Sequence, residues 1–168
     1  MVTNKGELVM KTHTKLGAGI ATLGVAAAVT LASSGSAGAA HGVIVVQGDL
    51  TGRAEVANDA TNNRVVGDPN GRGEAYVFSS NGTNICYLIE VDKIDTAIAA
   101  HIHEAVAGTN GDVVLALSAP SNGTSAGCVE PPTGSGLAAE ILLNPSDYYV
   151  NVHNAEFPGG AIRAQLGS

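Results

Sequence analysis

The sequence contains few basic residues, few aromatic residues and only two cysteines. Lysine and arginine together number 8, against 15 acidic residues, and there are 4 tyrosines, 2 phenylalanines and no tryptophan. A chain with so little positive charge repels phosphate backbones, which argues against nucleic-acid binding and favours the binding of cations. No segment after residue 40 keeps apolar residues at helical spacing for three turns, so a helical bundle is excluded.

The first 39 residues have the pattern of an export signal. Lys11 and Lys15 precede an uncharged, mostly apolar run at 16–32, and small residues follow it at 33–40. Cleavage after Ala39 or Ala40 satisfies the small-residue rule, and we favour Ala39. The sequence therefore predicts a signal peptide over 1–39, helical if present, and a secreted domain over 40–168.

An uncleaved membrane anchor is the alternative to a cleaved signal. The apolar run is rich in Gly and Ala and is marginal for the roughly 20 strongly apolar residues that a spanning helix needs. We therefore expect no membrane span once the signal has been removed.

Removal of the leader makes the chain more acidic. Five of the eight basic residues and fourteen of the fifteen acidic residues remain, which gives a net charge of −9. Cys86 and Cys128 also remain, and an even cysteine count in an oxidising compartment predicts one disulfide. Closing a loop of about 40 residues would contribute ~3–4 kcal/mol. The alternative, two free thiols that bind a metal, lacks the usual C-x-x-C spacing.

Short alternating or β-branched runs, separated by Gly, Asn, Asp and Pro clusters, make up the predicted mature domain. The pair Asn81-Gly82 predicts a tight hairpin turn. Residues 120–136 are expected to be mostly loop, and residues 137–143 fit either a short helix or a strand. This pattern predicts an all-β fold, either an antiparallel β-sandwich or a Greek-key barrel. The expected strands are 43–50, 73–79, 84–91, 97–104, 112–117, 148–153 and 161–166.

Three stretches together resemble a known family. They are AAHIHE at 99–104, GTNGDVVLAL at 108–117 and YYVNVHNAEFPGGAIRAQL at 148–166. In this order they are similar to the CHRD domain, first described in chordin and also found in bacterial exported proteins. The resemblance covers residues 42–166, with one departure at Ala105, where the family pattern has Gly. It implies an all-β extracellular domain and no defined reaction.

Three histidines form the candidate metal site. His101 and His103 lie two residues apart on an expected strand and so point to one face, and His153 shares a face of its own strand with Tyr149 and Asn151. Histidines on two adjacent or facing strands can converge on one ion, and imidazole suits copper or zinc. Cleavage after Ala40 would add His41, with its free amine, to the candidate ligands.

The same histidines also fit a structural role. With Glu104, Asn151 and Arg163 they could form a polar cluster, in which Arg163 pairs with Glu104. No serine lies in a nucleophile motif and no pair of carboxylates flanks the histidines, which argues against hydrolysis.

Three functions follow from these patterns. The first is a non-catalytic binding module with a copper or zinc site, and the second is a structural or protein-interaction module of the extracellular space without a metal. The third is a redox enzyme similar to copper-zinc superoxide dismutase, which also carries H-x-H on a β-sandwich, although its further ligands have no visible counterpart here. The expected partner is an extracellular protein or a metal ion.

Overall fold

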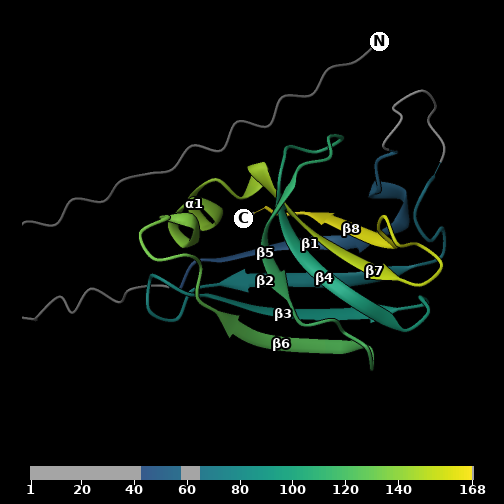
Figure 1. Cartoon of the computed structure of the whole chain (residues 1–168), viewed down its shortest axis with the longest axis horizontal. Helices are drawn as coiled ribbons and strands as arrows, with labels where there is room; N and C mark the ends of the chain where they lie inside the picture. Colours follow the sequence, from purple (N-terminus) through teal and green to yellow (C-terminus); the bar gives the residue numbers. More distant parts are fainter. Residues whose placement is uncertain (1–42, 58–64, 168) are drawn as a thin grey trace, which may run out of the picture. The chain divides into compact units, whose positions relative to one another are not determined.

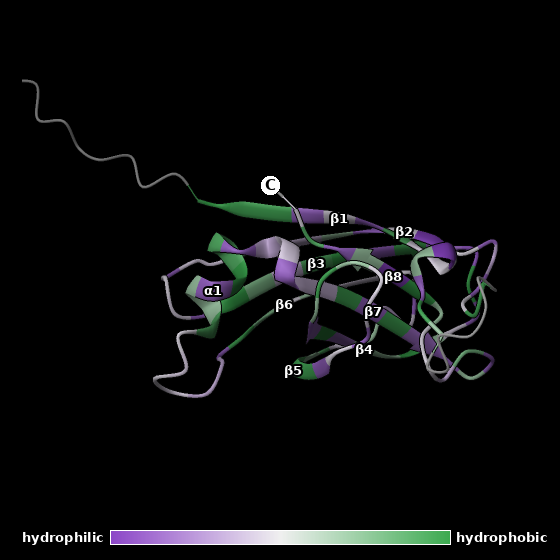
Figure 2. Ribbon diagram, turned by 90° about the horizontal axis from the view of Figure 1, so that it is seen from above, coloured by the Kyte–Doolittle hydropathy of each residue, from purple (hydrophilic) through white to green (hydrophobic). Residues whose placement is uncertain are grey.

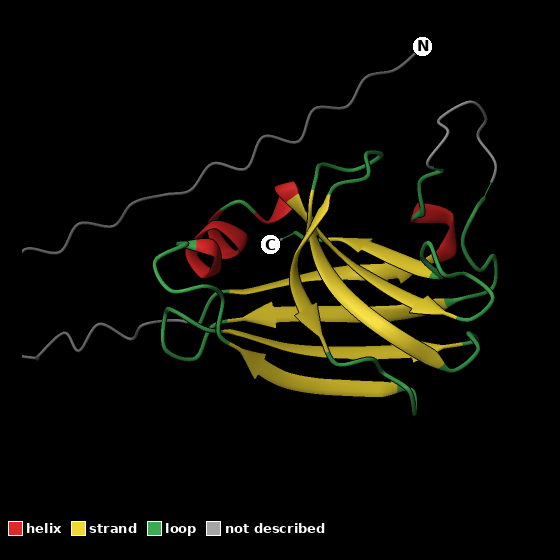
Figure 3. Ribbon diagram, viewed as in Figure 1, coloured by secondary structure: helices red, strands yellow, loops and turns green. Residues whose placement is uncertain are grey.

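The computed structural model describes residues 43–57 and 65–167, so the predicted signal peptide and His41 lie outside the described residues. Within the described residues the fold is all-β, as the sequence predicts, with one short α-helix and two 3-10 turns. Figure 3 shows the strands as its main part. No helix within the described ranges is long and apolar enough to cross a membrane. The strands are β1 (Val45–Thr51), β2 (Arg72–Phe78), β3 (Ile85–Asp92), β4 (Ala97–Glu104), β5 (Asp112–Leu117), β6 (Thr124–Val129), β7 (Tyr148–Asn154) and β8 (Ile162–Gln165).

All eight strands belong to one antiparallel sheet in the order β5-β4-β7-β8-β1-β2-β3-β6. The sheet curls into a nearly closed barrel, with β5 and β6 as its two ends (Figure 1). Of the two architectures predicted, the barrel is the one observed. The central strands β4, β7 and β8 lie side by side, which places the H-x-H motif beside the third histidine.

Alternate residues of the strands fill the inside of the barrel. Ile102, Val150, Val152 and Ile162 have no exposed surface, and Figure 2 shows hydrophobic and hydrophilic segments interleaved along the strands. The helix α1 (Leu137–Leu143) adds Ile141 to the same core. Strand β7 differs from an ordinary surface strand because both of its faces are buried, so something must also cover its outer face.

Two local predictions differ from the structure. Residues 124–129, expected in a loop, form β6, whose sequence TSAGCV is too polar to stand out as a strand but pairs with residues 85–90 of β3. Asn81-Gly82 does lie between two paired strands, but the turn is wide, because Asn84 and Asn81 accept hydrogen bonds from backbone amides within the loop.

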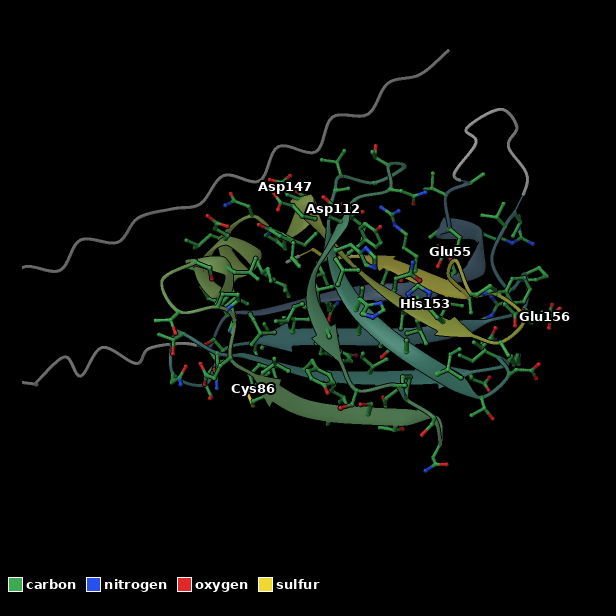
Figure 4. All side chains as sticks on the ribbon, in the orientation of Figure 1. Glu55, Cys86, Asp112, Asp147, His153 and Glu156 are labelled. Carbon is green, nitrogen blue, oxygen red and sulfur yellow. A yellow bond between two sulfur atoms is a disulfide. The ribbon has the colours of Figure 1, made fainter. Side chains whose placement is uncertain are left out.

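The two cysteines form the predicted disulfide. Cys86 on β3 and Cys128 on β6 stand directly opposite each other, with an S–S distance of 2.03 Å. No free thiol remains in the chain, so a metal site built from cysteines is excluded. Figure 4 shows Cys86 well separated from His153, so the disulfide lies away from the histidines.

Candidate functional site

The structure brings His101, His103 and His153 together on the outer face of the barrel. One ring nitrogen of each lies within 4.8 Å of the corresponding nitrogens of the other two. The closest pair is His101 Nδ1 and His153 Nε2, at 3.1 Å. His101 and His153 are half-buried, and His103 is 9% exposed. The alternation of β4 and β7 therefore produces the cluster that the spacing predicts.

A bulge accompanies the H-x-H motif. The register between β4 and β5 shifts between Ile102 and His103, whereas the pairing of His101 with Asn151 and of His103 with Tyr149 on β7 continues without a break. Bulges re-aim side chains next to functional sites. Here the irregularity falls on the β5 side and leaves the two histidines in register with β7.

Backbone carbonyls fix two of the three imidazoles. His103 Nδ1 lies 3.0 Å from the carbonyl oxygen of Gly111, and His153 Nδ1 lies 3.1 Å from that of Pro158. Because a carbonyl oxygen only accepts, each Nδ1 must carry the hydrogen, and each neutral ring has its lone pair on Nε2. The Nε2 of His153 accepts a hydrogen bond from His101 Nδ1. Metal-binding histidines have this arrangement, in which the second nitrogen donates to a carbonyl and fixes the ring.

Burial keeps the imidazoles neutral. It lowers the pKa of His101, His103 and His153 below the ordinary value of 6.5, and for His103 and His153 the carbonyl hydrogen bonds oppose part of this effect. A neutral imidazole is the form that binds a metal ion. The buried Nε2 of His103 has no hydrogen-bond partner within the described residues, so it is a free lone pair directed to no protein donor.

An aromatic stack connects His103 to a buried arginine. The His103 and Tyr149 rings are parallel within 8°, with centroids 4.7 Å apart, and Arg163 Cζ lies 3.4 Å from the centroid of the Tyr149 ring. Since β4 and β8 flank β7, the Tyr149 ring lies between the imidazole and the guanidinium. Arg163 is only 1% exposed, and this cation–π contact offsets part of its desolvation.

Arg163 also holds the loop that covers the site. Its guanidinium donates to the carbonyl oxygen of Val106 at 3.4 Å and to the side chain of Asn110 at 3.3 Å. Gln165 donates to the carbonyl oxygen of Ala105 at 2.9 Å, and Tyr149 accepts from the amide of Gly111 at 3.3 Å. The loop between β4 and β5 is therefore tied down over the outer face of β7 and β8, which explains why β7 is buried on both sides.

The predicted pairing of Arg163 with Glu104 is wrong. Glu104 is exposed, and it stands opposite Tyr148, whereas Arg163 stands opposite Asn151, so their side chains leave the sheet on different faces. The acid beside Arg163 is Glu55, just after the 3-10 turn η1 (Gly52–Ala54). Asn151 and Arg163 do belong to the buried polar cluster, together with Glu55.

Glu55 is buried, and its contacts offset only part of the cost of removing its charge from water. Its side chain is 8% exposed, and burial raises its pKa to about 7, although Arg163 and a hydrogen bond from Asn151 favour the charged form. The Asn151 amide donates to one carboxylate oxygen at 3.4 Å, and the other oxygen has no partner within the described residues. Figure 4 shows Glu55 and His153 at the same end of the barrel.

Sequence patterns identify the histidines and miss the groups that support them. Glu55 lies outside any strand, and the carbonyl groups of Gly111 and Pro158 carry no side-chain signature. Nothing in the spacing of the sequence links Glu55 to Arg163.

A protein-family model described as the CHRD domain matches residues 46–166, which is most of the chain. Neither the curated proteins nor the solved structures include a match to this chain.

Proposed function

This chain belongs to the CHRD domain family, and from that membership and the three-histidine geometry we propose that it is a secreted binding module holding one copper or zinc ion between His101, His103 and His153. Membership of the CHRD family supports a non-enzymatic binding module outside the cell, and a disulfide fits a secreted protein. The proposal includes the signal peptide over 1–39 and the CHRD domain over 40–168.

The observation that carries the metal proposal is the fixed orientation of the rings. Two Nδ1–H groups are committed to carbonyl oxygens, so His103 and His153 both offer Nε2. Nitrogens bound to one ion at about 2.0–2.1 Å in tetrahedral geometry lie about 3.3–3.4 Å apart. The three ring nitrogens, all within 4.8 Å of one another, need only small ring shifts to reach that spacing.

The choice of copper or zinc follows from the ligand type. Imidazole suits both ions, and within the described residues the cluster offers three nitrogens and no thiolate or carboxylate. Calcium and magnesium prefer oxygen ligands and are disfavoured.

A metal titration of the purified protein tests the proposal. We expect the wild type to take up one equivalent of Cu(II) or Zn(II), measured by equilibrium dialysis and metal analysis. His103→Ala should lose this uptake, and Glu104→Gln should keep it, because Glu104 belongs to the same motif but points to the other face. If the wild type takes up no stoichiometric metal, the proposal is wrong.

A protein-interaction module without a metal is the second candidate, because CHRD is a protein-binding type of domain. In that case the histidines are scaffold, and His103→Ala should lower the melting temperature by the same amount with and without added metal. A metal-binding wild type should instead gain about 2.7 kcal/mol of stability at a free metal concentration 100 times the Kd. His103→Ala should lose this gain.

A further inference from the structure

Three buried acceptor atoms on the outer face of the barrel have no hydrogen-bond partner within the described residues. They are His103 Nε2, Asn151 Oδ1 and Glu55 Oε1. A buried acceptor without a partner costs about 1–3 kcal/mol, so native proteins usually satisfy such atoms with an ordered water or an ion. Each of the three atoms therefore needs a hydrogen-bond donor or a cation as its partner.

Asn151 links the strand that carries the H-x-H motif to Glu55. Asn151 stands directly opposite His101 in the β4–β7 pairing and shares the outer face of β7 with His153. Side chains opposite each other on antiparallel strands have Cβ atoms about 4.5–5.5 Å apart. Asn151 is 4% exposed, so its amide is buried on the same face of the sheet as the imidazoles.

Glu55 reaches the same place from the β1–β2 connection. Its carboxylate accepts from Asn151 Nδ2 and lies against Gly160, where a Cβ atom would come within 2.5 Å of a carboxylate oxygen. Gly160 belongs to the β7–β8 hairpin, whose Pro158 carbonyl holds His153. Because Nδ2 of Asn151 is committed to Glu55, its Oδ1 is the atom left for another donor.

Three histidines leave a metal site one ligand short. Zinc and copper sites in proteins commonly have four ligands, and three-histidine sites complete the set with a solvent molecule. A water molecule has a lone pair for the ion and two hydrogens to donate. One ion and one water would together satisfy all three orphan acceptors.

We propose that the fourth ligand of the metal is a water molecule that donates hydrogen bonds to Asn151 Oδ1 and Glu55 Oε1, and that small anions reach the ion by displacing it. This inference rests on the metal site proposed above. It assigns Asn151 and Glu55 as positioning residues for the exchangeable ligand rather than as metal ligands.

The first measurement is made on the copper-loaded wild-type protein. We expect the water-proton relaxation rate to show an inner-sphere water, and a titration with sodium azide to produce an azide-to-copper charge-transfer band. If copper binds with one-to-one stoichiometry but neither signal appears, the site is closed and this inference fails while the metal site stands. If neither copper nor zinc binds with one-to-one stoichiometry, the proposed function itself fails.

The second measurement compares variants. Asn151→Leu removes one acceptor of the water, so azide should displace the water more easily and bind about 10-fold more tightly, which corresponds to one hydrogen bond of about 1.4 kcal/mol. The control is Val150→Ala, a fully buried position on β7 on the opposite face from the histidines, and its azide affinity should match the wild type.

A second variant keeps the test decisive if Asn151→Leu does not fold. At a pH above 7, where the carboxylate is charged, Glu55→Gln replaces it by a weaker neutral acceptor and should strengthen azide binding in the same direction, by about 3-fold. An azide affinity equal to that of Val150→Ala in the folded variants would overturn the assignment of the water to these two residues.

Discussion

The two faces of β7 are both buried, yet they are built from different chemistry. The inner face presents Val150 and Val152 to the apolar core, and the outer face presents Tyr149, Asn151 and His153 to a polar layer. The inner residues gain free energy from removing apolar surface from water, at about 25 cal/mol per Å². The outer residues must regain through hydrogen bonds and a cation–π contact what their desolvation costs. Burial on one face therefore stabilises the fold, and on the other it positions chemical groups.

The largest expected effect comes from the outer face. Arg163→Ala removes the contacts to Tyr149, Val106 and Asn110 and leaves Glu55 without its cation, so we expect a loss of about 3–5 kcal/mol in the free energy of unfolding, measured by urea denaturation. Arg163→Lys should recover part of this loss, because it keeps the charge but not the planar fork. A loss below about 1 kcal/mol for the alanine variant would show that the polar layer adds little to stability.

The next effect is that Glu55 makes the free energy of unfolding depend on pH. Its pKa of about 7 in the folded protein exceeds its ordinary value of 4.5, so the folded state holds the proton more tightly than the unfolded chain. The contribution of protonated Glu55 to the free energy of unfolding is complete below pH 4.5 and is lost as the pH rises to 7. Relative to Glu55→Gln, the metal-free wild type should therefore lose about 2–3 kcal/mol over that range.

Urea denaturation of the two proteins at a series of pH values measures this difference. The histidines, whose pKa values are lowered, impose the opposite slope, but they are present in both proteins and cancel in the comparison. A difference between the two proteins that stays constant with pH would show that Glu55 titrates at its ordinary value.

A smaller effect is expected from the inner face. Ile102→Val removes one methylene from a fully buried position between the two histidines of the motif and should cost about 1 kcal/mol. Because Ile102 points into the barrel, the metal affinity should stay within about 3-fold of the wild type, a shift of less than 1 kcal/mol. A larger change in affinity would mean that core packing, and not only the outer layer, sets the positions of the histidines.

The smallest effect should come from Tyr149→Phe. The variant keeps the ring between His103 and Arg163 and loses only the hydroxyl that accepts from the Gly111 amide. We expect a loss of about 0.5–1 kcal/mol in unfolding free energy. A loss above about 2 kcal/mol would show that the loop hydrogen bond, rather than the stack, holds this part of the outer face.

Alternation along strands is the part of the structure that the sequence predicts well. It assigns His101 and His103 to one face and Tyr149, Asn151 and His153 to one face of β7, because side chains in a strand have a period of two. Applied consistently, the same rule places Glu104 with Ile102, away from Arg163. The pair Glu104–Arg163 matches opposite charges, but its two side chains lie on opposite faces of the sheet.

The remaining parts of the site depend on contacts between distant loops. Glu55 lies 96 residues before Asn151, and the carbonyl groups that orient His103 and His153 come from turns whose side chains take no part. Strand β6 was missed for a related reason: it owes its conformation to its pairing with β3 rather than to its own composition. Local patterns carry no information on such long-range partners.

The position of the disulfide predicts which end of the sheet opens first. It binds the end strand β6 covalently to β3, whereas the other end strand, β5, is held by its ladder to β4 and by Leu115 and Leu117 in the core. Strand β5 should therefore separate from the sheet before β6, and the amide hydrogens of β5 should exchange before those of β6. Gly111, whose carbonyl orients His103, immediately precedes β5. An ion held by the three histidines would thus cross-link β4 and β7, next to the end strand that has no disulfide.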